Sequence, residues 1–253
     1  MKYYEQLISL GSFNYRNVVE ITGSEESTNK ILRDYIRKGY IEKIRRDYYV
    51  AISMETHQPV VNRYQIASNL YDDAYITHHS AFEAYGYANQ IFYNVYFTCK
   101  KRVTDFSYDG VNYLQTPLNR KSNVVQEGSI WLTSIEQTVV DSIKDYEKIA
   151  GLEEVLRCIE LIPSLNEDKL LECLLNYNNV YLYQKCGYIL ENIGKPLGIT
   201  DSFLKECQQH IGNSKHYLFK NDKSLILDKR WLLYVPPRLR TLVEKGAIGY
   251  DEI

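Results

Sequence analysis

The sequence predicts an α+β protein in which a small N-terminal part of helices and a two-stranded ribbon precedes a larger mixed α/β part. Two observations lead to this class. The first 55 residues contain three short helical patterns followed by two runs of strand character. Strand-like segments then give way to a mainly helical second half. The 253 residues suffice for two modest domains, and we predict the domains 1–55 and 56–253.

Three helices are predicted before residue 40, each with a recognisable start or end. The first ends at Gly11. The second begins after Asn14, a residue suited to cap a helix, and ends at Gly23. The third begins after Ser24 and closes before Gly39.

The third helix is predicted to have two different faces. At 100° per residue an apolar face collects Thr28, Ile31, Leu32, Tyr35 and Ile36. The opposite face carries a narrow polar and basic stripe of Asn29, Lys30, Arg33 and Arg37. Glu26 lies near this stripe, in the first turn, where an acid also favours the helix dipole.

The segments "YIEKIRR" and "YYVAI" predict two strands joined by a turn at Arg45, Arg46 and Asp47. The turn has no glycine, but an aspartate tolerates the left-handed conformation that tight turns often need. Three helices followed by such a ribbon are the order of a winged helix-turn-helix domain.

This segment is also the basic part of the chain. The formal net charge is −2, yet seven basic and two acidic residues lie between Ser27 and Arg46. A basic helix can lie in the major groove while a basic ribbon tip reaches the backbone or minor groove, so we predict DNA binding. A basic face on a protein-binding winged helix is the alternative. The predicted contacts are Ser27, Thr28, Asn29, Lys30, Arg33, Arg37, Lys38, Lys43, Arg45 and Arg46.

Residues 56–253 are predicted to form a mixed α/β domain with a helical second half. A helix over 62–70 and strands at "AYITH", "NVYFTCKK", "FSYDG", "VNYLQT" and "SIWLTS" come first, with a hairpin at Asp109-Gly110. Capping boxes are expected at Ser80 with Glu83 and at Ser134 with Gln137. Further helices are expected over 151–161, 166–176, 181–192 and 201–211, then strands at "KHYLF" and "RWLLYV" and a helix at "PRLRTLVEKG".

No enzyme motif in the sequence is accompanied by the strand or the further ligands that its chemistry requires. Gly11-Ser12 and Gly23-Ser24 lead to no Asp-x-Asp strand of a nucleotidyltransferase. The triplet Glu167-Asp168-Lys169 has the letters of the E-x-K motif of a metal-dependent nuclease, but it follows Asn166, a residue suited to cap a helix, and should open a helix. His78 and His79 lack a third ligand at metal-site spacing. We therefore predict no catalytic residue, metal or cofactor, and keep a nuclease-like enzyme carried by a winged helix as the alternative.

Two further basic groups, both outside the first domain, extend a DNA-facing surface or merely keep an edge soluble. They are Lys100, Lys101 and Arg102, and Arg120 and Lys121.

The cellular setting is expected to be the cytoplasm. The five cysteines are scattered without a C-x-x-C pair, so reduced thiols are expected. No apolar run reaches membrane-spanning length, and the N-terminus lacks a signal-peptide pattern. We expect no membrane partner.

The sequence resembles the AbiEi family of type IV antitoxins over most of residues 1 to 192. The stretches that carry the resemblance are "STNKILRDYIRKGYIEKIRRDYYV", "AYITHHSAFEAYGY" and "WLTSIEQTVVDSI". The first is similar to the recognition helix and wing of that family, and the others are similar to its C-terminal antitoxin domain. The Arg-Arg-Asp turn departs from the glycine-containing wing of the family, and the stretch from Gly194 resembles no family we can name.

The resemblance implies a transcriptional regulator that binds inverted repeats of double-stranded operator DNA in its own promoter and represses it. It implies a part in a toxin–antitoxin system for abortive infection, the bacterial defence against phage. The protein would counteract a nucleotidyltransferase-like toxin without forming a stable complex with it, and the C-terminal domain would supply the antitoxin activity.

Overall fold

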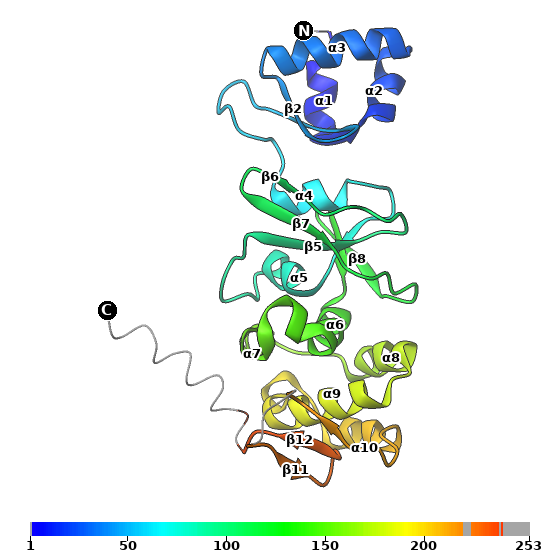
Figure 1. Ribbon diagram of the computed structural model, residues 1–253, viewed down its shortest axis with the longest axis vertical. Coiled ribbons are helices and arrows are strands. Elements are labelled where there is room, and N and C mark those ends of the chain that lie inside the picture. Colours follow the sequence, from blue (N-terminus) through cyan, green and yellow to red (C-terminus); the bar gives the residue numbers. More distant parts are fainter. Residues whose placement is uncertain (1, 220–223, 238, 240–253) are drawn as a thin grey trace, which may run out of the picture. The chain divides into compact units, whose positions relative to one another are not determined.

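The computed structural model describes residues 2–219, 224–237 and 239, and it has a mixed α/β fold (Figure 1). The chain divides into two compact units. The first holds the described residues up to Ser80, Phe92–Leu118 and Val124–Leu132. The second holds Ala81–Ile91, Asn119–Asn123 and the described residues from Thr133 onward. Residues 1–55 lie in the first unit with a larger sheet, and the predicted boundary near residue 55 stays a prediction.

The three N-terminal helices are present where the sequence predicts them: α1 at Tyr4–Leu10, α2 at Tyr15–Thr22 and α3 at Glu25–Arg37. Their predicted caps are confirmed. The Asn14 side chain accepts from the Asn17 backbone N–H, and the Ser24 side chain accepts from the Ser27 backbone N–H. Gly23 takes the left-handed conformation, with φ 79°, that ends α2.

The predicted ribbon consists of β2 at Ile41–Arg45 and β3 at Tyr48–Ala51, paired antiparallel. Its turn is shorter than expected, because Arg45 belongs to the strand. Asp47 adopts the left-handed conformation, with φ 58°, as predicted.

A third strand, β1 at Ser12–Asn14, pairs antiparallel with β3, so the sheet order is β1-β3-β2. The sequence reading missed it because three residues are too few to show an alternating pattern. The sheet and the three helices share one core of Tyr4, Leu7, Phe13, Val18, Leu32, Tyr35, Ile41, Tyr49 and Ala51.

The rest of the first unit is built on a six-stranded sheet in the order β6-β7-β5-β4-β9-β8. Its strands are β4 Tyr75–Ile76, β5 Asn94–Thr98, β6 Phe106–Tyr108, β7 Val111–Gln115, β8 Val124–Glu127 and β9 Ile130–Thr133. The predicted hairpin is confirmed, since Asp109 and Gly110 have φ of 48° and 73° between β6 and β7. The strand β8 was not predicted. Helix α4, Arg63–Ser68, starts after its capping residue Asn62.

The expected capping box at Ser80 and Glu83 is wrong. Helix α5 runs over His78–Tyr85 and therefore begins before Ser80. The buried Ser80 hydroxyl instead accepts from the Tyr96 backbone N–H at 2.9 Å, so it ties the helix to β5. A capping motif and a buried cross-link use the same residue type, and the sequence alone does not separate them.

The second unit is mainly helical. Its helices are α6 Ile135–Ile149, α7 Gly151–Glu160, α8 Glu167–Tyr177, α9 Val180–Ile193, η1 Lys195–Leu197 and α10 Asp201–Gln209. A small sheet of β10 His216–Tyr217, β12 Leu233–Val235 and β11 Ile226–Asp228 packs with them. The helices predicted between 151 and 211 are confirmed, whereas β11 was not predicted.

The capping prediction for α6 holds only in part. Ser134 caps the helix by accepting from the Gln137 backbone N–H, but the Gln137 side chain donates to Asp141 at 2.6 Å instead of closing the box. The predicted helix at "PRLRTLVEKG" lies almost wholly outside the described residues.

Helix α9 carries two close-packed positions. Gly187 lies against the Trp231 indole, so an added Cβ would be 2.0 Å from Trp231 Cζ3. The side chain of Lys185 is buried, and its ammonium donates to the carbonyl oxygens of Ile143 and Lys144 at 3.0 and 2.8 Å. These carbonyls precede Asp145, whose non-helical conformation kinks α6. Lysine 185 therefore satisfies backbone acceptors at the kink.

All five cysteines are buried and unpaired, as the reduced-thiol prediction requires. In the part of the chain that the structure describes, no helix has the length and apolar character needed to cross a bilayer.

Candidate nucleic-acid interface

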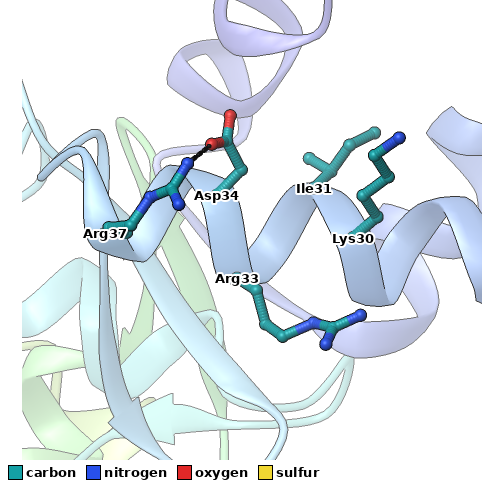
Figure 2. Close-up of a pocket in the computed structure, with 5 residues that line it drawn as sticks. All are labelled: Lys30, Ile31, Arg33, Asp34 and Arg37. Atoms are coloured by element: carbon teal, nitrogen blue, oxygen red, sulfur yellow. Dashed lines mark hydrogen bonds and ion pairs between the residues drawn. The ribbon is translucent and has the colours of Figure 1, made fainter.

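Helix α3 turns its apolar side into the N-terminal core and leaves its polar stripe in solvent. Leu32 and Tyr35 are buried, whereas Asn29, Lys30, Arg33 and Arg37 are exposed. Lys30, Ile31, Arg33, Asp34 and Arg37 border one surface depression on this helix (Figure 2). The predicted division of the helix into two faces is therefore present at Leu32 and Tyr35, but Ile36, which was predicted for the apolar face, is exposed.

Two of the predicted basic contacts form ion pairs within the helix. Arg37 Nη2 lies 2.7 Å from Asp34 Oδ1, the pair that Figure 2 marks, and Lys38 Nζ lies 2.8 Å from Asp34 Oδ2. Hydrogen bonding from Lys38, with a further contribution from Arg37, lowers the pKa of Asp34, and the same bond raises the pKa of Lys38. Exposed pairs of this kind contribute little stability, so a phosphate can replace Asp34 as the partner.

Tyr15, at the start of α2, links the ribbon tip to α3. This role was not predicted from the sequence. Its backbone N–H donates to the Asp47 carbonyl oxygen at 3.0 Å. Its hydroxyl donates to Asn29 Oδ1 at 3.3 Å. One tyrosine therefore spans the distance between the ribbon turn and the polar stripe, which places both on the same side of the N-terminal part. A tyrosine at the start of a helix gives no sequence signal of such a bridge.

The arginine one turn after Asn29 is also oriented by the helix. Arg33 Nε donates to the Asn29 carbonyl oxygen at 3.1 Å, and the Arg33 side chain is exposed. Figure 2 shows Arg33 extending from the side of the helix opposite to Asp34. Neither Lys30 nor Lys43 has an ion-pair partner within the described ranges.

Thr28 is a correction to the predicted set. It is fully buried, and its hydroxyl lies 2.6 Å from the Thr22 hydroxyl and donates to the Ser24 carbonyl oxygen at 2.9 Å. It therefore joins α2 to α3 and is not placed to touch a ligand. Ser27, by contrast, is partly exposed and accepts from the Ser24 hydroxyl at 3.0 Å.

The two arginines of the ribbon tip differ in their surroundings. The Arg46 side chain is 92% exposed, and its Nε lies 3.5 Å from Asp47 Oδ2. The Arg45 guanidinium lies 4.9 Å from the Phe106 ring centroid and donates to the Thr104 carbonyl oxygen at 3.4 Å. Arg45 is thus directed toward the six-stranded sheet, so the predicted solvent-facing role belongs to Arg46.

The other basic groups are exposed but belong to different units. Lys100, Lys101 and Arg102 follow β5 in the first unit. Arg120 and Lys121 lie in a loop of the second unit.

The residues of the nuclease-like triplet lie on a helix, as the sequence predicts. Glu167, Asp168 and Lys169 open α8, and the Asn166 side chain accepts from the Lys169 backbone N–H. The Glu167 carboxylate accepts from the backbone N–H and the hydroxyl of Thr200. The strand context that this motif needs is therefore not present at these residues.

Comparisons with known proteins support the fold alone. No model of a known protein family matches the chain, and no curated protein matches it. The chain is similar to the crystal structure of the RV2827C protein from Mycobacterium tuberculosis, with 12% sequence identity and a TM-score of 0.66. The match covers 97% of this chain and 94% of that chain. Such a similarity indicates a shared arrangement of helices and sheets over nearly the whole length.

Proposed function

We propose that residues 1–55 act as a winged helix-turn-helix that binds double-stranded DNA, with α3 in the major groove and the β2–β3 turn as the wing. The element order α1-β1-α2-α3-β2-β3 and the sheet order β1-β3-β2 support this assignment. The observation that carries it is the exposed stripe of α3, joined through Tyr15 to the ribbon tip.

The spacing of the stripe fits a groove. Asn29, Arg33 and Arg37 follow each other at intervals of four residues, so their Cα atoms span about 12 Å at 1.5 Å per residue. That length corresponds to roughly three to four base pairs at about 3.4 Å each. Asparagine and arginine are the side chains that pair with adenine and guanine edges, while Lys30, Lys38, Lys43 and Arg46 suit phosphate.

The biological role we propose follows the resemblance to AbiEi antitoxins. The protein acts in the cytoplasm as a non-enzymatic repressor of its own promoter by binding inverted repeats. It also counteracts a nucleotidyltransferase-like toxin without a stable complex, as a type IV antitoxin in abortive infection. Inverted repeats suit two copies of one binding domain on neighbouring half-sites.

A gel-shift on the region upstream of the coding sequence tests the DNA assignment. The variant Arg33→Ala with Arg37→Ala should abolish retention of this duplex, because it removes two cations from the middle and end of the stripe. The matched control is Lys195→Ala with Lys205→Ala, which removes the same charge from exposed positions of the second unit. If the α3 variant retains the duplex as the wild type does, the proposal that α3 lies in the major groove is wrong.

The antitoxin role has its own test. In cells whose growth is arrested by the product of an adjacent nucleotidyltransferase-like reading frame, co-expression of this chain should restore growth. The two proteins should not co-purify. Growth arrest that persists at full expression of this chain would contradict the antitoxin assignment and leave the DNA assignment standing.

A further inference from the structure

The β2–β3 ribbon is fastened to the six-stranded sheet beside it. Arg45 lies over the Phe106 ring and donates to the Thr104 carbonyl oxygen. Two residues after Phe106, the Tyr108 hydroxyl donates to a Glu42 carboxylate oxygen at 2.6 Å. Phe106 is itself stacked on Tyr113 of β7, with ring centroids 4.7 Å apart. These contacts bring the segment that precedes β6 next to the ribbon tip.

That segment begins with a loop whose backbone is held in place. Gln115 of β7 donates to the carbonyl oxygens of Lys101 and Cys99 at 2.8 and 3.2 Å, and it accepts from the Val103 backbone N–H at 2.8 Å. The Lys100 backbone N–H donates to Asp73 at 3.0 Å. The loop is therefore a fixed support, and its side chains at Lys100, Lys101 and Arg102 are exposed.

The acids close to this surface are already engaged by donors of the protein. Glu42 accepts from Tyr108, Asp73 from the Lys100 backbone, and Asp105 from the Gln115 backbone N–H at 3.1 Å. Asp47 lies beside Arg46.

The cations remain turned outward. The Lys100 side chain is 80% exposed, with its ammonium 3.8 Å from Asp73, and Lys101 lies with its ammonium 5.0 Å from the Tyr71 ring centroid. Arg102 has no ion-pair partner among the residues that the structure describes. The hydrogen bonds hold these carboxylates in place but leave their negative charge, so the positive groups that a ligand can reach here are the exposed side chains of Lys100, Lys101 and Arg102.

We infer that the loop Lys100–Arg102 continues the wing as a second DNA contact, which grips the phosphate backbone just outside the segment read by α3. The inference rests on the proposed function, because the same duplex must reach both surfaces. The ligand chemistry is phosphate, because Lys100 and Lys101 act as point charges and the Arg102 guanidinium also pairs with phosphate oxygens. Arg45 serves as a positioning residue that keeps the loop and the ribbon tip together.

The test measures how binding of the full chain depends on salt. The probe is a fluorescein-labelled duplex of the region upstream of the coding sequence, followed by anisotropy over a KCl titration. Each phosphate contact that is lost lowers the slope of log K against log[KCl] by about 0.9, so Lys101→Ala with Arg102→Ala should lower it by about 2. Lys195→Ala with Lys205→Ala, the same charge change on the second unit, should leave the slope unchanged.

Three outcomes overturn the inference, and they are distinguishable. In the first outcome the loop variant has the salt slope of the wild type, while Arg33→Ala with Arg37→Ala loses binding. The loop is then not a second contact, and the proposed function stands. Equal losses in the loop variant and the control show a net-charge effect only. No binding of any duplex by the wild type removes both. A matching thermal unfolding midpoint of the loop variant and wild type excludes misfolding as the cause of a changed slope.

Discussion

The buried ammonium of Lys185 makes the stability of the helical unit depend on pH in an unusual direction. Burial lowers the pKa of this lysine from its ordinary 10.5 to about 8. Asp145 and Glu147 oppose this effect, and Lys144 adds to it. The rings of Tyr146 and Tyr181 lie 4.9 and 4.7 Å from the ammonium. The folded chain therefore releases this proton at a lower pH than the unfolded chain does.

The sign and size follow from proton linkage. Above pH 8 the unfolded state binds more protons at this site than the folded state, so the free energy of unfolding rises with pH until about 10.5. The pKa of Lys185 is 10.5 in the unfolded chain and about 8 in the folded chain. Between pH 7 and pH 9.5 this difference raises the free energy of unfolding by about 2 kcal/mol. Lys185→Met removes this contribution.

Urea unfolding at the two pH values measures the effect. The chain has two tryptophans, and Trp231 is fully buried in the second unit, so a Trp131→Phe background makes fluorescence report that unit alone. In that background the chain that keeps Lys185 should gain about 2 kcal/mol relative to Lys185→Met when the pH rises from 7 to 9.5. An equal pH dependence of the two proteins would refute the reasoning.

Two further expectations concern packing and capping. Gly187→Ala should lower the free energy of unfolding by at least about 1 kcal/mol in urea unfolding followed by far-UV circular dichroism, because the clash with Trp231 outweighs the gain in helix propensity of about 1 kcal/mol; adding Trp231→Phe should restore part of the loss, and a stabilised single variant would contradict the close contact. Asn14→Ala should destabilise the first unit by about 1 kcal/mol, since it removes the α2 cap; urea unfolding followed by Trp131 fluorescence in a Trp231→Phe background checks this, and an unchanged midpoint would contradict it.

The sequence carried enough information for most helices of the chain, because local signals set them. Asn14 and Ser24 cap helices through their own side chains, and Gly23 ends one through its left-handed conformation. The exposed stripe of α3 followed from residue spacing alone. These features depend on residues a few positions apart, which a sequence displays directly.

The parts that the sequence did not reveal depend on distant residues. Strand β1 exists because β3 pairs with it, and β8 because β9 does. Thr28 is buried and bonded to Thr22, and Arg45 is half-buried and lies over Phe106, 61 positions later in the numbering. Residue type alone predicted a DNA contact at both positions, and the tertiary neighbours change that reading.

Site-directed crosslinking tests most directly whether α3 and the ribbon tip meet one duplex. All five native cysteines are buried, so a thiol-reactive photocrosslinker can be attached at Lys30→Cys or Arg46→Cys, with Lys205→Cys as the exposed control on the second unit. We expect crosslinks to the upstream duplex from positions 30 and 46 and none from position 205. Crosslinks from none of the three, or equally from all three, would contradict it.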